Sequence, residues 1–150
     1  MNNENYILCQ EYPFLIPRNA ITDEIEDGYD YSFTYLDECP KGWQELFLDM
    51  CVHIKPMLEE SGQLNNFRFI QIKEKYGRLV IYHAGAPVDV DNVISFYEDI
   101  SRTICIGCGN PATKITKGWI MPVCDSCADE HGIDGVDINE WFKGLEGAYE

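Results

Sequence analysis

The sequence predicts an α+β fold, with a small mixed sheet or hairpin, three to four helices and a four-cysteine knuckle resembling a zinc ribbon. Two β-rich segments lie between apolar patterns of helical period, and four cysteines form two CxxC pairs near the C-terminus. The length of 150 residues and a hydrophobic content of 45% suit one globular domain. Within that domain we expect residues 1–104 to form an α+β body, residues 105–131 a zinc knuckle and residues 132–150 a C-terminal helix.

The first forty residues alternate turn and strand signals. Pro13 and Pro17 interrupt the early apolar segment, because proline cannot donate to a backbone ladder. Aromatic residues then recur at every second position, namely Tyr29, Tyr31, Phe33 and Tyr35. This period predicts a half-buried strand over residues 29–35.

The period changes to that of a helix from Trp43. Apolar residues recur at intervals of three and four, namely Trp43, Leu46, Phe47, Met50, Ile54 and Leu58. Pro56 lacks an amide hydrogen, so we expect it to kink or end this helix near residues 52–55. Segments 67–72 and 78–82 are rich in β-branched and aromatic residues, and they predict a hairpin that turns over residues 73–77.

Two further helices complete the expected fold. Asp91 is a good N-cap for a helix that runs to residue 104 and leads into the first CxxC pair. Asp137 followed by Glu140 resembles a capping box at the start of the last helix. The apolar face of that last helix consists of Ile138, Trp141, Phe142 and Leu145.

The cysteine spacing predicts one structural zinc ion. The ligands are Cys105, Cys108, Cys124 and Cys127, in the pattern C-x2-C-x15-C-x2-C. Two residues between thiolates allow both sulfurs to reach one ion at about 2.3 Å, and the second pair completes a tetrahedron. Between the pairs, residues 114–116 and 119–121 could form two ribbon strands. The three other cysteines, Cys9, Cys39 and Cys51, are interpreted as small buried hydrophobic residues.

Two other readings of the cysteines stay open. One CxxC pair could perform thiol–disulfide chemistry, and His131 could replace one cysteine as a metal ligand. Catalysis at the zinc is not expected, because four thiolates close the coordination shell. The histidines are His53, His83 and His131, and none is followed at the second position by the glutamate of zinc deaminases. We therefore expect a protein that is not an enzyme.

Charge is unevenly distributed along this strongly acidic chain, whose net charge is −15. Residues 1–50 carry 11 acidic and 2 basic side chains, residues 51–122 carry 7 and 8, and residues 123–150 carry 8 and 1. Such a molecule is repelled by nucleic acid and attracted to basic protein surfaces. The candidate partner-binding residues are Asp23, Glu24, Glu26, Asp27 and Asp30. A second acidic group consists of Asp125, Asp129, Glu130, Asp134 and Asp137.

Three segments between Ile70 and Cys127 form a specific combination of motifs. The first reads Gln71-Ile72-Lys73-Glu74-Lys75-Tyr76-Gly77-Arg78-Leu79. The second is Ser101-x-Thr103-x-Cys105-x-x-Cys108-Gly109-x-Pro111-Ala112, and the third is Gly118-Trp119-x-x-Pro122-x-Cys124-x-x-Cys127. With these motifs the stretch resembles a family of small phage and bacterial proteins that hold zinc through four cysteines. In its acidity, zinc and size, the chain is also similar to zinc-containing anti-CRISPR proteins of phages.

These resemblances imply a protein inhibitor of phage origin, whose partner is a CRISPR nuclease–guide RNA complex. Such nucleases hold nucleic acid in basic channels, which an acidic protein could block. The alternatives are a zinc-ribbon adaptor protein and, third, a nucleic-acid-binding module built on the basic residues of the middle segment. We expect no direct nucleic-acid contact, because the net charge is −15. We also expect no membrane contact and a cytoplasmic location, because the sequence has neither a signal peptide nor a membrane-spanning run.

Overall fold

The computed structural model describes residues 3–148 and the side chains of residues 3–145, and it confirms the α+β class. The helices are α1 (Asn3–Glu11), α2 (Tyr35–Glu38), α3 (Gln44–Glu60), α4 (Val88–Ser101), α5 (Asp125–Glu130) and α6 (Ile138–Ala148). The strands are β1 (Arg68–Lys75), β2 (Arg78–Ala84), β3 (Lys114–Thr116), β4 (Pro122–Val123) and β5 (Gly135–Asp137). Short 3-10 helices cover Pro13–Leu15 and Lys41–Trp43. No described helix is long and apolar enough to cross a membrane.

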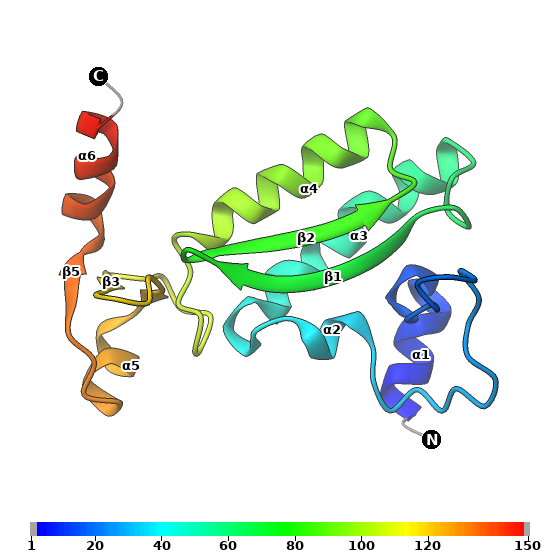
Figure 1. The fold of residues 1–150 in the computed structure, drawn as a ribbon, viewed down its shortest axis with the longest axis horizontal. Coiled ribbons are helices and arrows are strands. Elements are labelled where there is room, and N and C mark those ends of the chain that lie inside the picture. Colours follow the sequence, from blue (N-terminus) through cyan, green and yellow to red (C-terminus); the bar gives the residue numbers. More distant parts are fainter. Residues whose placement is uncertain (1–2, 149–150) are drawn as a thin grey trace.

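The predicted hairpin forms the centre of the body, and its strands are longer than expected. β1 and β2 pair in antiparallel register up to Lys75 and Arg78, so the turn consists of only two residues, Tyr76 and Gly77. Helices α3 and α4 lie along the hairpin (Figure 1). Phe47 of α3 meets Phe69 of β1 with ring centroids 5.1 Å apart, in the middle of the larger apolar core.

Helix α3 continues through Pro56, so the expected kink or end near residues 52–55 was wrong. A proline inside a helix costs about 3 kcal/mol. Ile54 and Leu58 lie one turn apart on the same face of the helix, on either side of Pro56 in the sequence, and both are fully buried. Each such side chain contributes about 1.5–3 kcal/mol when buried, which offsets the cost of the proline.

The N-terminal segment differs most from expectation. It begins with helix α1, which the turn and strand signals did not predict, and residues 29–35 form no strand. Thr34 and Asp37 instead form a capping box that starts α2. Tyr31 packs edge-on against Tyr6 of α1, with ring centroids 5.1 Å apart. The aromatic residues at every second position have no neighbouring strand to pair with, so they lie in a loop that packs on a helix.

The two predicted helix starts had different outcomes. Helix α4 begins at Val88 after Pro87, whereas Asp91 lies inside the helix, with its carboxylate 3.1 Å from His83 Nε2. Asp137 does cap α6, because its Oδ1 accepts hydrogen bonds from the backbone amides of Asn139 and Glu140.

The C-terminal part forms a second layer beside the tip of the hairpin (Figure 1). Its sheet has the strand order β4–β3–β5. The ribbon strand expected over residues 119–121 was wrong, because these residues belong to the turn after β3 and β4 begins only at Pro122. The unpredicted strand β5 connects the knuckle to α6. Cys105, Val123, Cys124 and Ala128 form a second, small apolar cluster, and Ile106 packs against both this cluster and the main core.

Candidate metal centre

The four predicted cysteine ligands converge on one point. Their sulfur atoms all lie within 4.8 Å of one another, and Cys108 Sγ is 3.6 Å from Cys124 Sγ. A tetrahedron with metal–sulfur bonds of about 2.3 Å has edges of about 3.8 Å, so the sulfurs are spaced as one metal ion requires. None of the seven cysteines, which all lie in the described residues, is in a disulfide.

Local backbone structure explains why each pair of cysteines points inward. In the first knuckle, the Cys105 amide donates to the Asn110 carbonyl at 2.8 Å, and the Gly109 amide donates back to the Cys105 carbonyl at 2.9 Å. In the second knuckle, Cys124 is the N-cap of α5, and its sulfur accepts from the Cys127 amide at 3.4 Å. Both turns hold the sulfurs in position with the backbone alone.

Backbone groups favour a thiolate at one of the four sulfurs. Burial opposes ionisation of Cys105, but the backbone amides of Cys124 and Cys108 among others point at its sulfur and lower its pKa to about 7. Neighbouring sulfurs raise the pKa of Cys127, with Cys108 the largest cause, so Cys105 ionises first and the other thiols lose their protons when a metal cation binds. Thiol–disulfide chemistry needs only one pair of cysteines, so the convergence of all four sulfurs favours a metal site over a redox pair.

His131, the alternative ligand, is not in the four-sulfur cluster. It is exposed at the C-terminal end of α5, and its backbone amide donates to the Cys127 carbonyl at 3.1 Å. The other histidines lie in the body. His53 Nδ1 is 3.1 Å from the Tyr97 hydroxyl, and His83 contacts Asp91.

Sequence reasoning missed how the knuckle is attached to the body. Gly42 donates its amide to the Ile106 carbonyl at 2.9 Å, and a Cβ at Gly42 would lie 2.2 Å from the Cys105 carbonyl oxygen. Next to it, the buried Trp43 donates its indole N–H to the Ile104 carbonyl at 2.9 Å. A glycine before a tryptophan in the sequence gave no sign of this long-range contact.

The predicted acidic partner-binding residues lie together in the long loop before α2, but they are not equivalent. Asp23 forms ion pairs with Arg68 at 2.9 Å and with Arg18 at 3.6 Å, so its charge is compensated. Glu26, Asp27 and Asp30 line one shallow cavity of about 440 Å³. Glu24 is exposed beside them.

The second acidic group is divided between the knuckle and its edges. Asp125 lies 3.7 Å from Lys114, and Asp134 lies 3.3 Å from Lys117. The other members, Asp129, Glu130 and Asp137, form no ion pair within the described residues. Two of the five charges are thus compensated locally.

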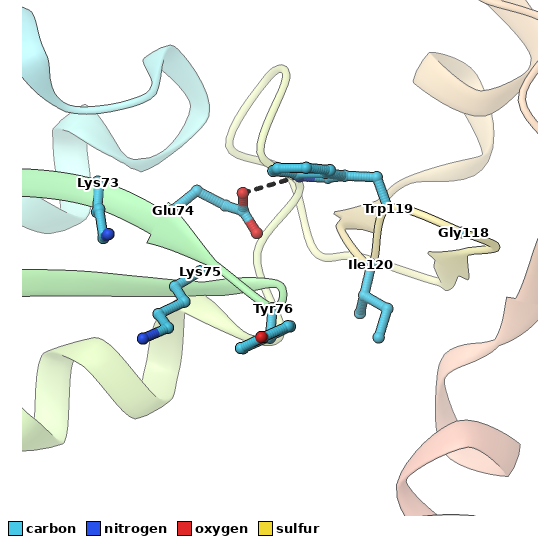
Figure 2. A pocket seen from close by; sticks show the side chains of 7 residues that line it. All are labelled: Lys73, Glu74, Lys75, Tyr76, Gly118, Trp119 and Ile120. Carbon is cyan, nitrogen blue, oxygen red and sulfur yellow. Dashed lines mark hydrogen bonds between the residues drawn. The ribbon is translucent and has the colours of Figure 1, made fainter.

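A cavity of about 370 Å³ lies where the hairpin tip meets the turn between β3 and β4 (Figure 2). Its lining residues are Lys73, Glu74, Lys75, Tyr76, Gly118, Trp119 and Ile120.

Comparison of this chain with models of protein families, with curated proteins and with solved structures finds no match.

Proposed function

We propose that the protein is a non-catalytic, zinc-stabilised inhibitor that binds a basic protein surface through its acidic N-terminal loop. Its proposed target is an RNA-guided CRISPR nuclease with its guide RNA, and binding blocks the engagement of DNA. The target class comes from the resemblance of residues 70–127 to small phage proteins. The binding mode comes from the chemistry of the described residues.

The observation that carries a structural role for the metal is the closed set of four sulfurs. Catalytic zinc sites keep a position for water or substrate, whereas four thiolates complete a tetrahedron. The cysteine-only ligand set and its tetrahedral spacing favour zinc over oxygen-seeking cations. The metal then stabilises the knuckle instead of reacting.

The uncompensated charge of the loop supports it as the contact surface. Glu24, Glu26 and Asp27 are exposed, and no ion pair holds them within the described part of the chain. Charges of this kind steer association with a basic surface and are screened over about 8 Å at physiological ionic strength. Asp23, which Arg18 and Arg68 neutralise, contributes mainly to the shape of the loop.

The test is binding of the zinc-loaded protein to a nuclease–guide complex by interferometry, at low and physiological salt. The variant Glu24→Lys/Glu26→Lys/Asp27→Lys should slow association at least tenfold without unfolding, because exposed charges contribute little to stability. The matched control, Asp129→Lys/Glu130→Lys, reverses exposed charges on the knuckle and should have a smaller effect. Absent binding, or binding indifferent to salt and to both variants, overturns the proposal and leaves the adaptor function.

A further inference from the structure

Three of the five basic residues that form no ion pair within the described structure line two adjoining cavities, one of which lies between the hairpin and the knuckle. Six of the protein's eleven basic residues form ion pairs, which leaves Lys41, Lys73, Lys75, Arg102 and Lys143 without one in the described structure. Lys73 and Lys75 line the cavity between the hairpin and the knuckle. Lys75 and Arg102 line a second cavity of about 320 Å³, which shares Lys75 and Tyr76 with the first.

Aromatic rings, not carboxylates, hold these three cations in place. Lys73 lies over Tyr82 with Nζ 5.6 Å from the ring centroid, and Arg102 lies over Phe142 at 5.0 Å. Lys75 lies 6.0 Å from the centroid of Tyr76. A ring orders a cation without cancelling its charge, so the two joined cavities attract an anion.

Large aromatic side chains are exposed around the same cavities. Trp119 is 71% exposed and Tyr76 is 76% exposed. Figure 2 shows the Trp119 ring above the Glu74 carboxylate and Tyr76 below it, while Lys73 and Lys75 lie to the left along β1. Trp141 lines the second cavity, so flat apolar surface continues from one cavity into the next.

Trp119 is fixed in this orientation by a contact across the cavity. Its indole N–H donates to Glu74 Oε2 at 2.9 Å, and Glu74 Oε1 accepts from the Gly77 amide at 2.8 Å. Both carboxylate oxygens are therefore engaged, which reduces the repulsion that Glu74 exerts on an anionic ligand. The backbone on the knuckle side is set by Thr116, whose hydroxyl bonds the Trp119 carbonyl and the Met121 amide.

Tyr76 occupies a backbone position that disfavours its residue type. Its φ is +53° and that of Gly77 is +79°, as in a two-residue hairpin turn with both central residues left-handed. Asparagine is preferred at such a first position, and a bulky side chain there is strained. The turn thus presents an exposed ring at a conformational cost that packing of the ring does not offset.

We infer that these two cavities bind single-stranded nucleic acid, with bases stacked on Trp119, Tyr76 and Trp141 and phosphates near Lys73, Lys75 and Arg102. Stacking rings beside uncompensated cations are the features that such binding uses. Two adjoining cavities with rings and cations fit successive nucleotides better than one isolated nucleotide. An acidic peptide would match the charge but would not need the exposed rings of Trp119 and Tyr76 or the half-buried ring of Trp141. The inference departs from the expectation, based on the net charge of −15, that the protein makes no direct contact with nucleic acid, because Lys73, Lys75 and Arg102 gather at these cavities. This site lies outside the acidic loop of the proposed function and does not depend on that proposal.

The test uses the full zinc-loaded chain, a fluorescent single-stranded decanucleotide and no nuclease, with fluorescence anisotropy as the readout. We expect a dissociation constant on the order of 10⁻⁵ M at about 50 mM salt. Three phosphate contacts give a logarithmic salt slope of about −2, so binding weakens about 20-fold at about 200 mM salt. Lys73→Gln/Lys75→Gln should reduce the slope to about −0.7, whereas the control Lys41→Gln/Lys143→Gln should leave it unchanged.

Ring variants separate binding from folding. Trp119→Ala should weaken binding about 5- to 100-fold, and the control Phe96→Ala, an exposed ring on α4 outside both cavities, should not. Tyr76→Asn should weaken binding while the melting temperature holds or rises, because asparagine suits the turn. A purely structural role for Tyr76 would not give this opposite response.

Three outcomes overturn the inference. One is the absence of binding to both DNA and RNA strands at low salt. Another is equal competition by poly-glutamate, which would show that charge alone is recognised. The third is equal affinity for a free mononucleotide and the decanucleotide, which would exclude a strand as the ligand. Because no nuclease is present, none of these outcomes bears on the proposed inhibitor function.

Discussion

Removal of the metal is expected to unfold the knuckle and to leave the body folded. Ile106 and Ile133 are half-buried against the small cluster around the cysteines, in which the fully buried apolar residues besides Cys105 and Cys124 are Val123 and Ala128. Those two apolar side chains contribute about 2–4 kcal/mol. A structural zinc ion contributes on the order of 10 kcal/mol to a small fold, so the proposed zinc would dominate the stability of this region. The body retains its own, larger core, which includes Trp43, Phe47 and Phe69.

The assay is amide hydrogen exchange followed by mass spectrometry, with and without a strong zinc chelator. Protection should be lost over β3, β4 and α5 and should persist over α3 and the β1–β2 hairpin. Cys124→Ser should reproduce the loss, and elemental analysis should show less than one zinc per chain. Cys51→Ser is the matched control, since Cys51 is a buried cysteine outside the site and its variant should keep one zinc.

Two results would refute this reasoning. Protection that persists in the knuckle of the metal-free protein would mean that apolar packing alone is sufficient there. Protection that is lost equally over the body would mean that knuckle and body fold as one unit, coupled through residues such as Ile106, which packs on both apolar clusters.

Three further predictions concern individual residues. Gly42→Ala should lower the melting temperature by at least about 3 °C, or about 1 kcal/mol, because its Cβ would lie 2.2 Å from a knuckle carbonyl oxygen. Gly144→Ala, with open space around it, should not. Burial raises the pKa of Glu98 above 4.5, so stability from this group falls as pH rises from 4.5 through the folded pKa, and Glu98→Gln should flatten that part of the pH–stability curve. Burial raises the pKa of Cys9 to about 11 and that of Cys39 to about 12, so neither should be alkylated at pH 8 in the folded protein, while both react in guanidinium; rapid labelling of the folded chain would contradict this.

The sequence alone determined features that depend on short spacing. Four cysteines in two CxxC pairs predicted the converging sulfurs, because two intervening residues suffice to turn a chain around one ion. The hairpin and the cap at Asp137 were predictable for the same reason, since neighbouring residues in the chain make their hydrogen bonds. The helix through Pro56 was not, because burial of its apolar face outweighs a local preference.

Only the tertiary structure decided which surfaces are charged and how the two layers meet. Asp23 counted as a free acidic residue in the sequence, yet Arg68, 45 positions along the chain, neutralises it across the fold. Trp119 and Glu74 are also 45 residues apart, and their hydrogen bond joins the knuckle to the hairpin. Contacts at such separations depend on how the elements pack, and no local pattern of residue types specifies them.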